Sequence, residues 1–283
     1  MQGPYIYTLY KDQKDNPESV VAALITTGFV TAGITASFVG SLADRHGRKL
    51  ACLCYCISYS ISCLSVLSDD IVVLFVGRAF GGLSTTLQYT VFETWMISEY
   101  HKRDLSDCLP LGSMFSLSLT VSSIIAIVSG VIGEALVSYT GTKTSPFMLA
   151  IVLLVTAFAT MHNKWSENYG EVTSEKSSGA GNLRDLLSDK RVLALGFNTT
   201  LFEGSMYLFV FFWSPAIISS RSLAGDESPP PFGVIFSCFM CAMMLGSFIF
   251  SSLKPEMVRD AATLMLSVLA LATFVKSLPS TVC

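Results

Sequence analysis

Charged side chains are scarce in this sequence. Of its 283 residues, 14% are Asp, Glu, Lys or Arg, whereas an ordinary soluble domain carries about a quarter. Apolar residues make up 51%, and the mean hydropathy is +0.56. Uncharged runs recur at lengths near the roughly 20 residues that span a bilayer core. This composition excludes an ordinary soluble domain and predicts a protein that crosses a membrane several times.

Groups that perform catalysis or bind metals are also scarce. The three histidines, His46, His101 and His162, each lie at the end of an apolar run, and no nucleophile elbow, phosphate loop or carboxylate pair accompanies them. The eight cysteines form no paired CxxC elements, so we interpret them as small apolar packing residues. We therefore expect no enzyme activity, metal or cofactor. The net charge of −3 gives no reason to expect nucleic acid as a partner.

Eight apolar segments have the length of a membrane-crossing helix. They are residues 20–42, 50–67, 71–97, 110–137, 146–162, 192–217, 232–253 and 261–278. Backbone groups inside lipid need internal partners, so the predicted fold is all-α. Residues 1–10 lack a signal-peptide pattern and resemble the last turns of a helix. The expectation is an incomplete bundle of eight full spans plus the end of a first.

Lysine and arginine are distributed unevenly between alternate loops. One set of loops carries twelve of them and the opposite set four, while Arg78 and Lys276 lie within spans. Because cytoplasmic loops are enriched in these residues, the first set is predicted to be cytoplasmic. Both ends of the chain would then lie outside, and a plasma-membrane location is expected.

A polar segment at residues 163–191 divides the chain into two helical bundles, residues 1–162 and 192–283. Its first part is rich in Gly and Ser and predicts a flexible chain. Its end, from Asn182, is either a short interfacial helix or a tether with a chance leucine cluster. The two bundles echo each other weakly, because "QGPYIYTLY" (2–10) is similar to "EGSMYLFVF" (203–211). Parallel repeats of this kind are typical of transporters.

The segment "GSLADRHGRK", residues 40–49, places charge directly after the first apolar run. Positive-inside bias alone would explain its cations but not its acid and glycines. The segment resembles the loop signature G-x-x-x-D-R-x-G-R-K of the major facilitator superfamily. The matching residues are Gly40, Asp44, Arg45, Gly47, Arg48 and Lys49. In that family the loop latches the cytoplasmic side of two bundles, so the resemblance implies a gating role.

Other segments of the sequence also resemble this superfamily. "GRAFGG" is similar to the superfamily's R-x-x-x-G pattern, with Arg78 and Gly82. "QGPYIYTLY", "GSLADRHGRK", "FETWMISEY" and "LFEGSMYLFVFFWSPA" resemble the molybdate-anion transporter family. What this resemblance implies is a twelve-helix carrier that brings molybdate, a tetrahedral dianion, into the cell.

Ionisable residues inside spans are functional candidates because they are costly there. Arg78 is our first candidate for attracting an anion, and its alternative is a structural pair with an acid. Glu203 is a candidate for proton coupling or site organisation, and its alternative is a protonated acid bonded between helices. Glu93 suits a gate near the inner end of its span. Further candidates for the site are Tyr207 and, on the opposite wall, Gln2 and Tyr5.

The expectation is thus a secondary-active carrier that works by alternating access, as a monomer, with molybdate as the substrate that the resemblance implies. Two alternatives stay open. The chain could be an inactive or regulatory truncated fragment of such a carrier, or it could belong to a carrier of another small solute.

Overall fold

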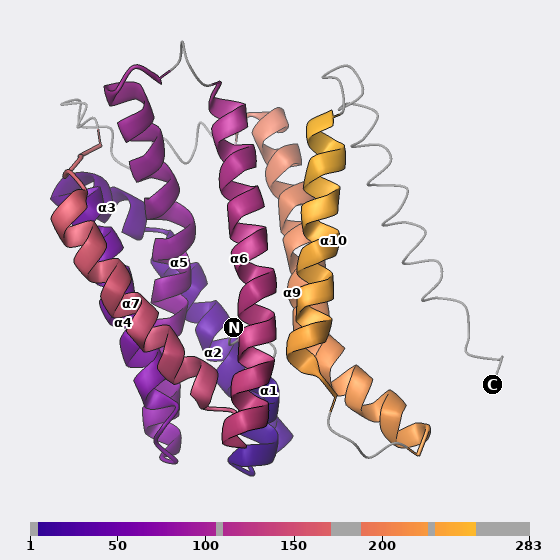
Figure 1. The fold of residues 1–283 in the computed structure, drawn as a ribbon. Helices are drawn as coiled ribbons and strands as arrows, with labels where there is room; N and C mark the ends of the chain where they lie inside the picture. The colour runs from indigo at the N-terminus through magenta and orange to yellow at the C-terminus, as the bar shows by residue number, and fades with distance from the viewer. Residues whose placement is uncertain (1–4, 106–109, 171–187, 226–229, 253–283) are drawn as a thin grey trace.

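The computed structural model describes residues 5–105, 110–170, 188–225 and 230–252. Within these ranges all regular elements are helical (Figure 1). They are α1 (Ile6–Thr8), the π-helical turn η2 (Leu9–Gln13), α2 (Glu18–Ala36), α3 (Val39–His46), α4 (Arg48–Ser65), α5 (Ile71–Lys102), α6 (Leu111–Thr140), α7 (Ser145–Lys164), α9 (Lys190–Leu223) and α10 (Phe232–Ser252). The all-α prediction is confirmed for this part of the chain. Gln2, the proposed interfacial helix and the span at 261–278 lie outside the described residues.

Five of the described helices are long and apolar enough to cross a membrane: α2, α5, α6, α7 and α9. The largest extensions beyond the predicted C-terminal bounds are those of α5, which reaches Lys102, α6, which reaches Thr140, and α9, which reaches Leu223. The 32 residues of α5 correspond to about 48 Å at 1.5 Å per residue, which exceeds a hydrocarbon core of about 30 Å. The charged ends of such a helix therefore project past the apolar layer.

The first predicted span, residues 20–42, is not one helix. α2 ends at Ala36, and Phe38 leaves helical geometry with φ −132° and ψ −19° before α3 begins. Five residues of the 40–49 signature consequently lie on helices, Gly40, Asp44 and Arg45 on α3 and Arg48 and Lys49 on α4, and only Gly47 lies between them. The apolar run crosses this break without a Gly or Pro, and its composition therefore gave no sign of it.

Helices α2 and α4 pack on α5, α7 packs on α4, and α6 packs along α10 (Figure 1). Two apolar clusters stabilise the first group. One lies toward η2 and contains Leu9, Tyr10, Val21, Leu24, Cys63 and Leu74. The other lies toward α3 and contains Val39, Cys52, Leu53, Cys56, Leu87 and Val91. Cys52, Cys56 and Cys63 are buried free thiols in these clusters, as the packing interpretation predicts.

Glycines set the close approach of α2 and α5. A Cβ on Gly82 would lie 2.9 Å from Cβ of Thr31 and 3.0 Å from the backbone N of Ala32, and it would also collide with the carbonyl oxygen of Gly28. Backbone atoms cannot move aside as a flexible side chain can, and so the approach requires glycine. The glycine of the R-x-x-x-G pattern thus has a packing role.

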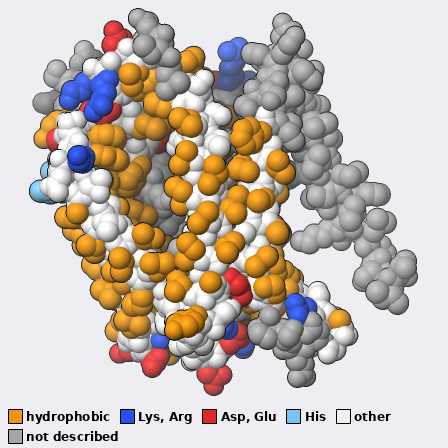
Figure 2. All heavy atoms as spheres, in the orientation of Figure 1, with side chains coloured by type: hydrophobic (Ala, Val, Ile, Leu, Met, Phe, Trp, Pro, Cys, Tyr) orange, Lys and Arg blue, Asp and Glu red, His pale blue; other side chains and the backbone are white. Residues whose placement is uncertain are grey.

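The visible outer face is largely apolar, and the charged side chains gather mainly toward the two ends of the helices (Figure 2). Large hydrophobic residues such as Val72, Ile125 and Val155 are more than half exposed. A water-facing surface of this kind is avoided by soluble proteins. A lipid environment accounts for it.

Candidate functional site

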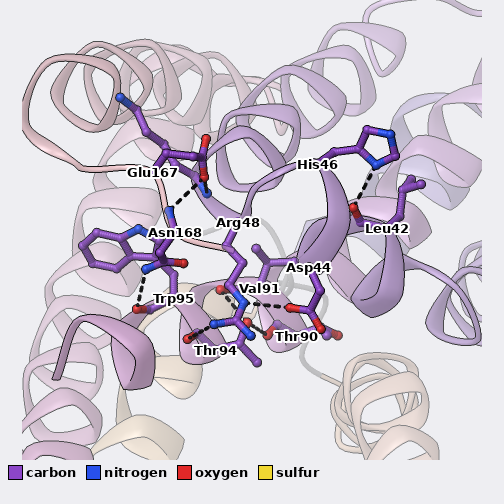
Figure 3. Close-up of polar contacts among 11 residues, drawn as sticks. Leu42, Asp44, His46, Arg48, Thr90, Val91, Thr94, Trp95, Glu167 and Asn168 are labelled. Atoms are coloured by element: carbon purple, nitrogen blue, oxygen red, sulfur yellow. Dashed lines mark hydrogen bonds and ion pairs between the residues drawn. The ribbon is translucent and has the colours of Figure 1, made fainter. Parts of the chain in front are cut away.

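Residues Gly40–Lys49, here called the clasp, form a helix and a tight turn. The turn is at Gly47, where φ is +113° and ψ is 131°, a conformation that side chains other than hydrogen disfavour. The guanidinium of Arg48 donates from Nε to Oδ1 of Asp44 at 2.8 Å and from Nη1 to the carbonyl oxygen of Thr94 at 3.3 Å (Figure 3). Arg48 therefore joins α3, α4 and α5.

A segment that packs against the clasp was not predicted from the sequence. Residues 165–170, here called the strap, follow α7 and lie across the start of α4. The carboxylate of Glu167 accepts from the backbone N–H of Lys49 at 2.7 Å and of Leu50 at 3.2 Å. These amides belong to the first turn of α4, where N–H groups lack helical partners and an anion is favoured. Glu167 thus caps α4 from outside that helix.

Gly47 is constrained by this cap as well as by its backbone angles. A Cβ at this position would lie 2.6 Å from Cδ of Glu167 and 2.7 Å from its Oε1. Glycine leaves the space in which the carboxylate reaches the amides. The signature glycine and the strap acid therefore depend on each other.

Further contacts hold the strap on α5. Trp95 and Trp165 stack with ring centroids 3.7 Å apart, and the Trp95 indole N–H donates to the carbonyl oxygen of Ser166 at 3.0 Å. Nδ2 of Asn168 donates to the carbonyl oxygen of Trp95 at 3.2 Å (Figure 3). Composition predicts a flexible chain here, but residues 165–170 make defined contacts. Trp165 and Glu167, just after the predicted span 146–162, were the sequence signal that could have indicated this ordered segment.

The remaining clasp residues differ in their surroundings. Nζ of Lys49 donates to the carbonyl oxygen of His162, at the end of α7, at 2.9 Å. Arg45 is exposed, and Gly40 faces a methyl group of Thr90 at an ordinary 3.5 Å. Asp44 accepts from Arg48, four residues further along the chain.

Arg78 lies on α5 among η2, α2 and α4. Its Nη2 would lie 3.1 Å from a Cβ on Gly28, and its guanidinium interacts with the fully buried Tyr10 and with Tyr59. Its Nε is buried and makes no hydrogen bond, and none of the ion pairs of the described residues includes it. Within the described chain Arg78 is thus a cation without an acid partner.

Glu203 and Tyr207 lie one turn apart on α9 and line a shallow surface hollow of about 680 Å³ on that helix. The ring of Tyr207 contacts that of Phe29 on α2 edge to face, with centroids 4.9 Å apart. Tyr207 also interacts electrostatically with Glu203 and with Tyr89 of α5. The structure therefore groups Tyr207, Glu203 and Tyr89, but it gives no contact between Glu203 and Arg78.

Glu93 is exposed and lines a groove of about 600 Å³ between α5 and α6. Its neighbours along the groove include Gln88 and Tyr89 on α5 and Ser118 and Ser122 on α6. Glu93 and Tyr89 thus line one groove between α5 and α6.

Tyr5 is 2% exposed and does not line an open wall in this structure. Its hydroxyl donates to Oε2 of Glu134 on α6 at 2.7 Å, and the backbone N–H of Gly233 on α10 donates to the same oxygen at 2.8 Å. Glu134 was not identified from the sequence. An acid between apolar residues in "SGVIGEALV" was the signal that could have found it.

Among the described residues, no group of three or more His, Cys, Asp or Glu side chains is placed to hold a metal ion. The charged residues instead form interhelical contacts at the helix ends, and the guanidinium of Arg78 lies between helices without an acid partner in the described chain. This geometry defines an all-helical, multi-pass membrane protein.

The chain belongs to the MFS_5 family, described as sugar transporters with 12 transmembrane segments, whose profile matches residues 1–283. The resemblance to the major facilitator superfamily is thereby confirmed. Three similar curated proteins are each called a molybdate-anion transporter. That of Xenopus tropicalis is 34% identical over 251 residues, that of Takifugu rubripes 32% over 277, and that of Danio rerio 31% over 279.

Each alignment covers 88% of this chain but only 54–55% of the relative. The chain thus spans about half the length of the curated relatives that it matches. No solved structure matches it.

Proposed function

We propose that this protein is a secondary-active carrier of molybdate that works by alternating access. The observation that carries the proposal is the sequence identity of up to 34% with proteins called molybdate-anion transporters. The family description mentions sugar transporters instead, so the chemistry of the substrate has to be argued from the residues.

Arg78 favours an oxyanion over a sugar. Arg78 is the eighth residue of α5, and a charged side chain inside a membrane helix is costly unless an acid partner offsets part of that cost. The described residues provide no such acid for Arg78. A guanidinium presents several donors in a fork that matches oxyanions, whereas a neutral sugar needs no cation. Arg78 is therefore the residue proposed to attract molybdate.

The acids in the helices take the other roles in this proposal. Glu203 couples transport to protons or organises the site together with Tyr207, because the two share one face of α9. Glu93 gates the groove between α5 and α6. Gln2, outside the described residues, stays a candidate for the opposite wall, whereas Tyr5 is engaged by Glu134 in this conformation.

The clasp is proposed to control alternating access from the cytoplasmic side. Twelve Lys and Arg residues in the loops on its side against four on the other support this orientation. The two moving units are residues 1–162 and 192–283, with 163–191 between them, and the carrier is a monomer in the plasma membrane. Arg48 fixes the clasp within the first unit, and Glu167 ties the clasp to the segment between the units.

Uptake of radiolabelled molybdate tests the proposal. The 283-residue chain is expressed in cells with low endogenous uptake, with the Xenopus tropicalis relative as the positive control. We expect uptake by the chain, competition by tungstate and none by glucose. Uptake in the control but not in cells with the chain would refute the proposal for this polypeptide.

Two variants test the assigned roles. Arg78→Ala is expected to reduce uptake at least about tenfold, the equivalent of about 1.4 kcal/mol, and Arg78→Lys to retain part of it. Glu203→Gln should reduce uptake, while Glu18→Gln, at the exposed start of α2, serves as the matched control. Unchanged uptake in Arg78→Ala and Glu203→Gln would remove both residues from the mechanism.

A further inference from the structure

Glu134 lies on α6, six residues before the helix ends, and it joins three separate parts of the chain. Both of its hydrogen bonds, from the Tyr5 hydroxyl and from the Gly233 amide, end on Oε2. Tyr5 precedes α1, and Gly233 is the second residue of α10. No Lys or Arg among the described residues forms an ion pair with Glu134.

The amide of Gly233 is one of the first-turn N–H groups of α10, which have no partner within their own helix. A carboxylate at this position also interacts favourably with the positive end of the helix dipole. Hydrogen bonds to a charged group contribute more than bonds between neutral groups. The contact is therefore a strong one for a single side chain.

The helices around Glu134 are in backbone contact. A Cβ on Gly130 would lie 2.8 Å from the carbonyl oxygen of Gly233, and a Cβ on Gly233 would collide with the carbonyl oxygen of Gly130. The hydroxyl of Ser237 on α10 donates to the carbonyl oxygen of Ile127 on α6 at 3.0 Å. Glu134 thus lies beside the glycines, Gly130 and Gly233, at which α6 and α10 pack closely.

Apolar side chains enclose the same region. Tyr5 packs with Trp213 of α9 and Phe232 of α10 in a cluster that also includes Val137 of α6. Tyr5, Trp213 and Phe232 are each less than a tenth exposed. The hydrogen bonds from Tyr5 and Gly233 therefore lie beside a buried apolar cluster, where water competes poorly for them.

The two sides of this contact belong to different halves of the chain. Tyr5 and Glu134 precede residues 163–191, whereas Gly233 follows them, and the contact lies at the end of the helices opposite the clasp (Figure 1). From this arrangement we infer that Glu134 is a positioning residue that ties the two halves together at that end. The tie closes this end in the present conformation and breaks when the carrier opens it. The inference rests on the proposed alternating access.

Backbone hydrogen–deuterium exchange of the full 283-residue chain in lipid nanodiscs tests the tie without any substrate. Glu134→Ala removes the acceptor, and exchange in residues 232–237 is expected to become about tenfold faster. Glu134→Gln keeps an oxygen at the same place and should stay close to the parent. Ser129→Ala is the matched control, because that hydroxyl donates only within α6.

The response of the clasp end separates a tie from a merely structural contact. A tie predicts that exchange in residues 47–50 slows, because opening one end favours closure of the other, whereas a merely structural contact leaves it unchanged and would overturn the inference. Faster exchange at both ends would mean general destabilisation and would overturn the inference. So would unchanged exchange in residues 232–237.

Molybdate uptake is measured in parallel for the same variants. Uptake that is absent from the parent chain contradicts the proposed function, while the exchange data still decide whether the contact exists. If the parent takes up molybdate, Glu134→Ala should lower the maximal rate and Glu134→Gln should restore it. Equal rates in all three would overturn the role of the tie.

Discussion

The dependence between Gly47 and Glu167 allows a quantitative test by a double-mutant cycle. Glu167→Ala removes the carboxylate that accepts the amides of Lys49 and Leu50. Loss of a helix cap costs about 0.5–2 kcal/mol, so we expect a loss of about 1 kcal/mol in the free energy of unfolding. Nothing else in the turn needs to move.

Gly47→Ala has two effects. At φ +113° and ψ 131° a Cβ introduces backbone strain of about 1–3 kcal/mol. The new methyl group would also occupy the space of the Glu167 carboxylate, 2.6 Å from Cδ, and displace the cap. The expected total is about 2–4 kcal/mol, of which about 1 kcal/mol is the lost cap.

The double variant should therefore be about as stable as Gly47→Ala alone. Once the cap is lost, removing Glu167 costs nothing further, and the two single losses should exceed the double loss by about 1 kcal/mol. The free energy of unfolding can be measured by titrating SDS into mixed detergent micelles. Gly141→Ala is the control for strain alone, because φ is +69° there and no atom lies within 4 Å of the added Cβ. Additive losses, within about 0.5 kcal/mol, would refute the proposed dependence.

Two further predictions use the same stability measurement. Gly82→Ala should destabilise the protein by about 1–3 kcal/mol, because a Cβ there meets the backbone of α2. Gly33→Ala, which faces open space on α2, should have no such effect, and equal losses in both variants would contradict the packing argument. Arg48→Lys should cost about 1 kcal/mol, because one ammonium cannot reproduce the geometry of the bonds to Asp44 and Thr94. A Lys variant as stable as the parent would show that charge alone suffices.

The membrane-crossing character and most helix positions could be predicted from the sequence because they depend on local hydrophobicity. A run of about 20 uncharged residues has few alternatives to a helix in lipid. The break at Phe38 could not be predicted in this way. The residues on both sides of it are equally apolar, and Gly40, which lies beyond the break, was assigned to a loop.

The candidate site was predictable in part. The clasp was recognised from fixed spacing within ten residues, and Arg78 from its charge in an apolar run. Glu167 and Glu134 were missed for a common reason. Each carboxylate bonds amides more than 90 positions away in the sequence, and no local pattern indicates which distant helix end will need an acceptor.

The sequence by itself determined that the chain crosses a membrane, where the apolar spans lie, and which short signature it carries. These properties follow from side-chain hydrophobicity and local spacing. Only the tertiary structure decided which acids cap which helix ends. It also decided that Tyr5 contacts Glu134 and does not line an open cavity. The physical reason is that a hydrogen bond acts over about 3 Å, so its partner depends on how distant helices pack.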